Sequence, residues 1–385
     1  MTVSRLRGIP GIGVDRVGDA ADQLCDPDVL RLENLDTDLR PPAAALARTH
    51  EAIDDDAANS YLPFTGLRSL REAAAARVGR SAGVEYDAAS ECIVSAGGLA
   101  GILNVLLAIV EPGDEVVLTD PTYAGLINRV HLAGGIPRFA RLNAGPQGWR
   151  LDLDSLAAAI GPRTKALLIM SPSMPSGFVL SRDEWLAIAA HCESRGMWLV
   201  YDAAMERILF DGRSVVHPAS FPGMRDRTIT VGAVSKEYRM IGWRVGWIVG
   251  PESIMNDVRL VSLSNVVCQV GIAMGGASAA LTAADDGVAS AVAEWEGRRD
   301  FLMDALSDLP VIRPHGGWSM LVDTRRLGVE PPDASRLLLE HGKVAATPMT
   351  GWGPEADRYL RFVFANEPVS RLQDLRERIR RSWRT

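Results

Sequence analysis

Short apolar segments alternate with helical segments along most of this 385-residue chain. The segments at 115–121, 166–172, 197–202 and 228–234 are rich in apolar residues, and each leads into a turn or loop. Short apolar runs of this kind are typical of parallel strands that are buried on both faces. Their alternation with helices predicts an α/β fold with a mostly parallel sheet.

The length of the chain predicts more than one domain. We expect an N-terminal arm at 1–30, a large domain at 46–288 and a linking helix at 289–306. Residues 31–45 and 307–385 would then form a smaller α+β domain. The arm contains the glycine-rich stretch GIPGIGVDRVG, but no strand precedes it and its spacing fits neither phosphate-binding motif. We therefore do not expect a nucleotide loop there.

Composition excludes several classes of function. The net charge of −7 disfavours nucleic-acid or membrane-surface partners, which favour a basic face. Four scattered cysteines form no C-x-x-C motif, so we expect no metal site and no disulfide framework, and free thiols suit the cytoplasm. No apolar run is long enough to span a membrane, and the first residues lack a signal-peptide core.

One lysine is placed differently from the other two in the chain. Lys165 and Lys343 lie where a loop enters a strand, whereas Lys236 follows the apolar strand at 228–234, directly after Ser235. Burial of a lysine charge is costly without a partner. Arg244 follows eight residues later, between two glycines. A lysine that forms a Schiff base and an arginine that holds a phosphate would explain this pattern, and pyridoxal 5′-phosphate (PLP) chemistry needs both.

The segment SKEYRMIGWRVGW at 235–247 resembles the lysine signature of class I/II aminotransferases, the aspartate-aminotransferase-like PLP enzymes of fold type I. The resemblance runs from about Leu32 to the C-terminus. It implies a PLP-dependent aminotransferase that acts on an α-amino acid through a Schiff base on Lys236. It also implies a homodimer with shared active sites.

A phosphate site is expected where a strand at 92–95 turns into an apolar helix. Gly97 and Gly98 lie in this turn, and backbone N–H groups at a helix N-terminus bind anions. The resemblance implies that the turn holds the cofactor phosphate together with Ser235 and Arg244. Many relatives carry a polar side chain where this chain has Leu99, so only its backbone would contribute. Tyr61 would contact the cofactor phosphate of the partner subunit.

Three further roles follow from the resemblance. Tyr123 would stack on the pyridine ring, and Asp202 would pair with the ring nitrogen. An aspartate at a strand end and an arginine within an apolar strand each need an opposite charge. In the family the arginine that corresponds to Arg361 binds the substrate α-carboxylate in a bidentate pair.

Two positions depart from the family pattern. Met174 and Met205 stand where relatives have an asparagine and a tyrosine that hydrogen-bond the phenolic oxygen of PLP. Thioethers cannot donate these bonds, so we expect a raised pKa for the Schiff base. The departure favours an alternative function, in which the enzyme catalyses β- or γ-elimination, replacement or cyclisation on an amino acid.

A third possibility is a non-catalytic sensor domain, but the roughly thirty residues before the family-like region contain no basic helix. The identity of the substrate side chain is open. Trp243, Trp318 and Trp352 are candidates for a pocket, although packing explains each of them as well.

Overall fold

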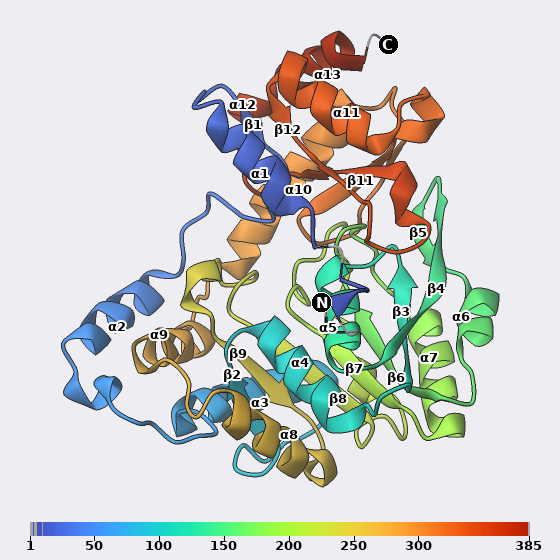
Figure 1. Ribbon diagram of the computed structural model, residues 1–385. Helices are drawn as coiled ribbons and strands as arrows, with labels where there is room; N and C mark the ends of the chain where they lie inside the picture. Colours follow the sequence, from blue (N-terminus) through green and yellow to red (C-terminus); the bar gives the residue numbers. More distant parts are fainter. Residues whose placement is uncertain (1–2, 4–5, 10, 384–385) are drawn as a thin grey trace.

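In the computed structural model, which describes residue 3, residues 6–9 and residues 11–383, an eight-stranded sheet organises the larger part of the chain (Figure 1). Its strand order is β2-β9-β8-β7-β6-β3-β4-β5. The strands are β2 (Cys92–Ser95), β9 (Gly246–Val249), β8 (Thr228–Ala233), β7 (Trp198–Asp202), β6 (Thr164–Met170), β3 (Glu115–Asp120), β4 (Ile136–Gly145) and β5 (Gly148–Leu151).

Most of this sheet is parallel. β8, β7, β6, β3 and β4 pair in parallel, whereas β9 pairs antiparallel with β8 and β2, and β5 pairs antiparallel with β4. β3, β7 and β8 are buried along nearly their whole length, as their apolar sequences predict. The predicted α/β fold with a mostly parallel sheet is therefore confirmed.

Helices lie between, before and after these strands. They are α2 (Ala43–Ile53), α3 (Arg68–Ala82), α4 (Gly98–Ile109), α5 (Ala124–Leu132), α6 (Leu153–Ala159), α7 (Arg182–Arg195), α8 (Glu252–Asn265) and α9 (Gly271–Thr282). They flank the sheet, except that α2 and α9 lie together at the left of Figure 1. The apolar stretch that follows β9 forms the two helices α8 and α9, which are separated by residues 266–270. No helix in the described ranges has the length and apolar character that a bilayer span requires.

A smaller group of elements follows the long helix α10 (Val288–Ala305) and lies at the top of Figure 1. Its four-stranded antiparallel sheet has the order β10-β11-β14-β13. The elements are β10 (Val311–Ile312), β11 (Ser319–Asp323), β13 (Thr347–Pro348), β14 (Tyr359–Val363), α11 (Pro331–Leu337), α12 (Val369–Leu372) and α13 (Leu375–Trp383). A separate parallel pair joins β1 (Leu30–Arg31) to β12 (Val344–Ala345), so a segment from the first part of the chain lies beside one from the last part.

Two local features bear on the site. The arm contains helix α1 (Val14–Gln23), which packs through Val17 and Ala21 beside β12. β9 starts at Gly246 and not at Arg244, because Arg244 has a left-handed backbone (φ 53°) that ends a short 3₁₀ turn. This conformation is uncommon and costly for a non-glycine residue, and such residues cluster at functional sites.

Candidate functional site

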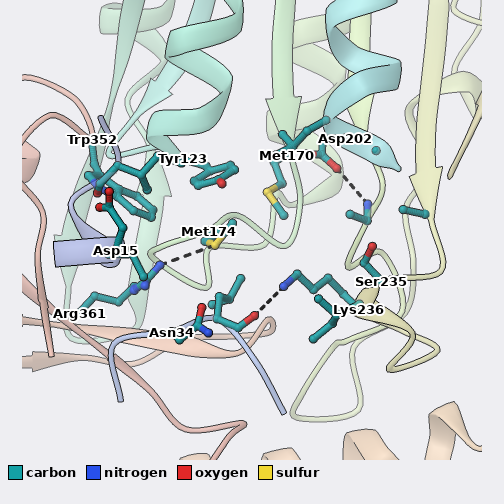
Figure 2. Close-up of a pocket in the computed structure, with 18 of the residues that line it drawn as sticks. Asp15, Asn34, Tyr123, Met170, Met174, Asp202, Ser235, Lys236, Trp352 and Arg361 are labelled. Atoms are coloured by element: carbon teal, nitrogen blue, oxygen red, sulfur yellow. Dashed lines mark hydrogen bonds between the residues drawn. The ribbon is translucent and has the colours of Figure 1, made fainter. Parts of the chain in front are cut away.

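A cavity of about 670 Å³ opens where β6, β7 and β8 end (Figure 2). Met170 and Asp202 are the last residues of β6 and β7, and Ser235 and Lys236 follow β8 closely. Ligands bind at this edge in open α/β sheets, because the loops after parallel strands meet there. The predicted site residues that line the cavity are Gly98, Leu99, Tyr123, Met174, Asp202, Ser235, Lys236, Arg244 and Arg361.

The amine of Lys236 points into this cavity from the turn after β8. Its Nζ donates a hydrogen bond of 2.7 Å to the carbonyl oxygen of Leu35 and lies 4.8 Å from the ring centre of Trp318. Burial lowers the pKa of the Lys236 amine to about 7, with smaller contributions from the surrounding charges. A large fraction of this amine is therefore neutral and nucleophilic near neutral pH.

A buried carboxylate faces the cavity from the end of β7. Asp202 is 5% exposed, and its Oδ1 accepts a hydrogen bond of 3.0 Å from the backbone N–H of Ala204. Burial raises the pKa of Asp202 to about 6, although the positive charges of Arg129 and Lys236 oppose this shift. No ion pair within the described ranges neutralises Asp202, so the carboxylate is available to a cationic group bound in the cavity.

The N-terminus of α4 and the side chain of Arg244 face each other at another wall. Gly97 caps this helix with φ 85°, and a Cβ at Gly97 would lie 2.6 Å from Nη2 of Arg244. Arg244 Nη1 also donates to the hydroxyl of Ser235 at 3.4 Å and to the carbonyl of Ile241 at 2.9 Å. A helix N-terminus, a hydroxyl and a guanidinium together form a suitable site for a phosphate.

Tyr123 supplies an aromatic wall beside this anion site. It precedes α5, and a Cβ on Gly125 would collide with the Tyr123 ring, so the glycine makes room for the side chain. The ring centre of Tyr123 lies 5.3 Å from that of Trp352 at an interplanar angle of 53°. Burial raises the pKa of the Tyr123 phenol, so the group stays neutral and a planar ligand can pack against it.

Arg361 enters the cavity from β14 of the smaller sheet. It is 1% exposed, donates from Nη2 to the carbonyl of Glu33, and lies 4.8 Å from the ring centre of Trp352. Its Nη1 meets the sulfur of Met174 at 3.8 Å, and its Nε has no hydrogen-bond partner among the described residues. Burial lowers the pKa of Arg361 to about 10. A buried guanidinium without a carboxylate partner is a strong candidate to bind an anionic ligand.

Three predicted site residues do not line this cavity. Tyr61 is 83% exposed on the surface, as a residue that serves a partner subunit would be. Met205 is 2% exposed, and its sulfur lies 3.6 Å from where a Cβ on Gly317 would be, because the turn after β7 directs the side chain into the protein. Gly97 lies next to the lining residue Gly98 but does not itself line the cavity.

Sequence reasoning missed several lining residues. The arm contributes Ile12 and Asp15, and the glycines on either side of Ile12, Gly11 and Gly13, have positive φ angles of 86° and 79°. These glycines were the only sequence feature that could have indicated a turn of the arm at this place, since glycine adopts positive φ angles that other residues resist. Asn34 and Leu35, on the segment that follows β1, also line the cavity.

The three tryptophans that we considered for a pocket differ in position. Trp352 lines the cavity, and its Nε1 donates to the carbonyl of Ile12 at 3.0 Å. Trp318 lies against the amine of Lys236 without lining the cavity. Trp243 instead donates to Thr49 of α2, 2.8 Å away, and serves packing between α2 and the rest of the chain.

Together these groups fit the chemical parts of PLP. A neutral amine suits its aldehyde, the α4 N-terminus with Arg244 suits its phosphate, and the unpaired carboxylate of Asp202 suits a protonated pyridine nitrogen. Figure 2 shows Lys236 and Asp202 on one side of the cavity, with Arg361 and Trp352 on the other side. The remaining cationic group, Arg361, is left to bind a second ligand.

Comparisons with known proteins agree with this fit. The family described as aminotransferase class I and II matches residues 28–379. An arginine–pyruvate transaminase of Pseudomonas aeruginosa is 34% identical over 350 residues, which cover 89% of this chain and 87% of the relative. The solved structure of N-succinyldiaminopimelate aminotransferase from Mycobacterium tuberculosis has a TM-score of 0.91 and 30% identity, and the match covers 98% of this chain and 99% of that one. Aspartate aminotransferase from Thermus thermophilus has a TM-score of 0.90, 28% identity and 99% coverage of both chains.

Proposed function

Because this chain belongs to the class I and II aminotransferase family and is a PLP-dependent aminotransferase, we propose that Lys236 is the residue that holds the cofactor and moves the proton. The observation that supports this role most directly is the amine of Lys236, which lies in the cavity and has a pKa of about 7. When substrate displaces it from the cofactor, a neutral amine at this place can take the proton from the substrate α-carbon and later return it.

The residues around Lys236 bind and orient the cofactor in this proposal. Arg244, Ser235 and the turn at Gly97 and Gly98 hold the phosphate. Tyr123 packs on the ring. Bound PLP supplies an electron sink for the charge left at the substrate α-carbon, and Asp202 supports that sink by keeping a proton on the ring nitrogen.

Arg361 binds the substrate α-carboxylate in the same proposal. Its guanidinium faces the cavity without a carboxylate partner among the described residues, and Trp352 and the carbonyl of Glu33 fix its orientation. The relatives are named for arginine, N-succinyldiaminopimelate and aspartate, so family membership does not select the amino donor.

The enzyme is further proposed to be a homodimer whose two active sites share residues. The exposed Tyr61 supports this arrangement, as do apolar side chains exposed on and between α8 and α9, among them Leu260, Val267 and Val270. Exposed apolar groups gathered in this way mark protein interfaces. We also propose a cytoplasmic location, since all four cysteines are free thiols.

The predicted domain division is proposed with the same limits, 46–288 for the large domain, and 31–45 with 307–385 for the small one. Pairing of β1 with β12 supports the joining of the two small-domain segments. The limit between 45 and 46 falls inside α2, so this helix contributes residues to both sides of it.

A single-turnover experiment tests the proposed function. PLP-loaded protein is mixed with a pool of amino acids but no keto-acid acceptor, and cofactor and products are analysed by mass spectrometry. We expect the cofactor in its amine form together with a keto acid that matches one member of the pool. The same experiment with Lys236→Ala should yield neither.

The alternative function predicts a different product. If PLP stays in its aldehyde form while an amino acid loses a leaving group, is joined to another molecule or is cyclised, the alternative replaces transamination. Met174, which meets Arg361 in the cavity, is the structural feature that would then need explanation. Met205 is buried and does not line the cavity, so it would not be involved directly.

A further inference from the structure

The cavity retains an unassigned region after the cofactor and the α-carboxylate are accounted for. This region is lined by Ile12, Val14 and Asp15 of the arm, Asn34 and Leu35 of the following segment, and Trp352. Under the proposed function, the substrate side chain extends into it. The region therefore determines which amino acid reacts, and the following inference rests on the proposed function.

Most of this region is apolar. Ile12 and Val14 present aliphatic side chains, and Trp352 is fixed on one side by its hydrogen bond to the carbonyl of Ile12. Such a lining suits the methylene stem of a long side chain. It does not suit a polar group immediately next to the α-carbon.

One carboxylate interrupts the apolar lining. Asp15 lies in the first turn of α1 and faces the cavity close to Trp352 in Figure 2. Asp15 and Asp202 are the two acidic residues of the described lining, and the proposed function assigns Asp202 to the ring nitrogen. It forms no ion pair within the part of the chain that the structure describes. Its charge is thus free to receive a cation.

The positive charges of the cavity are already used. Lys236, Arg244 and Arg361 are the basic residues of the described lining, and the proposed function assigns each of them. Among the described residues of one subunit, a second substrate carboxylate would meet no unassigned cation in the lining and would be repelled by Asp15.

We propose that Asp15 binds the cationic end of the substrate side chain, so that the preferred amino donor is an amino acid with an aliphatic stem and a terminal amine or guanidinium. Asn34 is exposed and also lines the cavity, and its amide oxygen can accept a hydrogen bond from a donor on the substrate. Asp15 is itself exposed. The bound pair would join two charges of opposite sign, and a charge-assisted hydrogen bond is stronger than one between neutral groups.

A simpler role for Asp15 is electrostatic support of the α1 N-terminus, where acidic residues are favourable. That role would affect folding of the arm but not the choice of substrate. Asp19, an exposed acid one turn later on α1 that does not line the cavity, is a matched control.

The test compares donors that differ in charge but not in size. The PLP-loaded enzyme is assayed at steady state with a saturating keto-acid acceptor, and the donors are arginine and citrulline, lysine and 6-hydroxynorleucine, and, as an acidic donor, glutamate. We expect a higher kcat/KM for the cationic member of at least one pair. Asp15→Asn should lower this preference about 10- to 100-fold, mainly through KM, whereas Asp19→Asn should leave it unchanged. Equal melting temperatures of the two variants would exclude a general effect on folding.

Each outcome decides a different point. Turnover of neutral or acidic donors without a cationic preference would overturn this inference and leave transamination standing. A cationic preference that survives Asp15→Asn would overturn the role of Asp15. Absence of the amine form of the cofactor with every donor would overturn the proposed function and this inference together.

Discussion

Lys236 combines two properties that a surface lysine lacks, namely a cavity position and a pKa lowered by burial. Lys343 is a natural contrast, because its amine pairs with Asp26 at 2.7 Å on the surface and this contact raises its pKa. Amines react only when unprotonated, so the two lysines should separate along a pH series.

We therefore expect trace acetylation of the PLP-free protein to label Lys236 half-maximally near pH 7. Lys343 should need a far more alkaline solution. The measurement is peptide mass spectrometry after labelling at stepped pH values. If the labelling curve of Lys236 coincided with that of Lys343, burial would not be controlling this amine.

The guanidinium of Arg244 is expected to contribute to cofactor affinity only through the phosphate group of PLP. Replacement Arg244→Ala removes a charged donor beside Ser235 and the α4 N-terminus, and should raise the Kd for PLP about 10- to 100-fold. Pyridoxal, which lacks the phosphate, provides the control. Its affinity, followed by absorbance, should change little, and an equal loss for both ligands would contradict the assignment.

At the scale of elements, Gly246 of β9 lies in close contact with Gly97 and Gly98, in the turn before α4. A Cβ on Gly246 would lie 2.8 Å from the carbonyl carbon of Gly97 and 2.9 Å from the backbone nitrogen of Gly98. The same atom would lie 2.8 Å from the carbonyl oxygen of Gly232 in β8. Backbone atoms on two sides leave little room for adjustment.

Gly246→Ala should therefore lower the free energy of unfolding by about 1–3 kcal/mol. Gly242, in the adjoining 3₁₀ turn, would place a Cβ with no atom within 4 Å, so Gly242→Ala is the matched control. Denaturant unfolding of the PLP-free proteins makes the comparison, since bound cofactor would itself add stability. Equal losses in both variants would argue against the close contact.

The elements that could be predicted from sequence were those with strong local signals. β3, β6, β7 and β8 have apolar runs that follow from burial on both faces, and their ends correctly indicated where Asp202 and Lys236 would lie. The helix in the arm and its contribution to the cavity could not be predicted in this way. Asp15 and Trp352 are more than three hundred residues apart in sequence and meet through tertiary contacts alone.

At the scale of the whole molecule, the proposed sharing of active sites means that two variants with different substitutions can restore one intact site in a mixed dimer. A Tyr61→Ala subunit keeps its own Lys236, and a Lys236→Ala subunit keeps its own Tyr61. A mixed dimer then contains one site with both residues intact, formed by the lysine of the first subunit and the tyrosine of the second.

Mixing the two inactive variants under conditions that exchange subunits should restore activity to about a quarter of the wild-type level, because random pairing makes half of the dimers mixed and each has one intact site. Sedimentation should show dimers for each variant alone. Mixtures that form mixed dimers yet remain inactive would show that Tyr61 does not reach the other subunit.

The arm runs from the larger sheet, where Gly8 approaches His131 of α5, past the cavity to α1 beside β12. This segment therefore borders the cavity that substrate must enter. By contrast, α13 lies at the top of Figure 1, in the smaller group of elements. An affinity tag or a fluorescent fusion is thus better placed after α13, and kinetic constants measured with a tag ahead of the arm would report on the tag as well as on the enzyme.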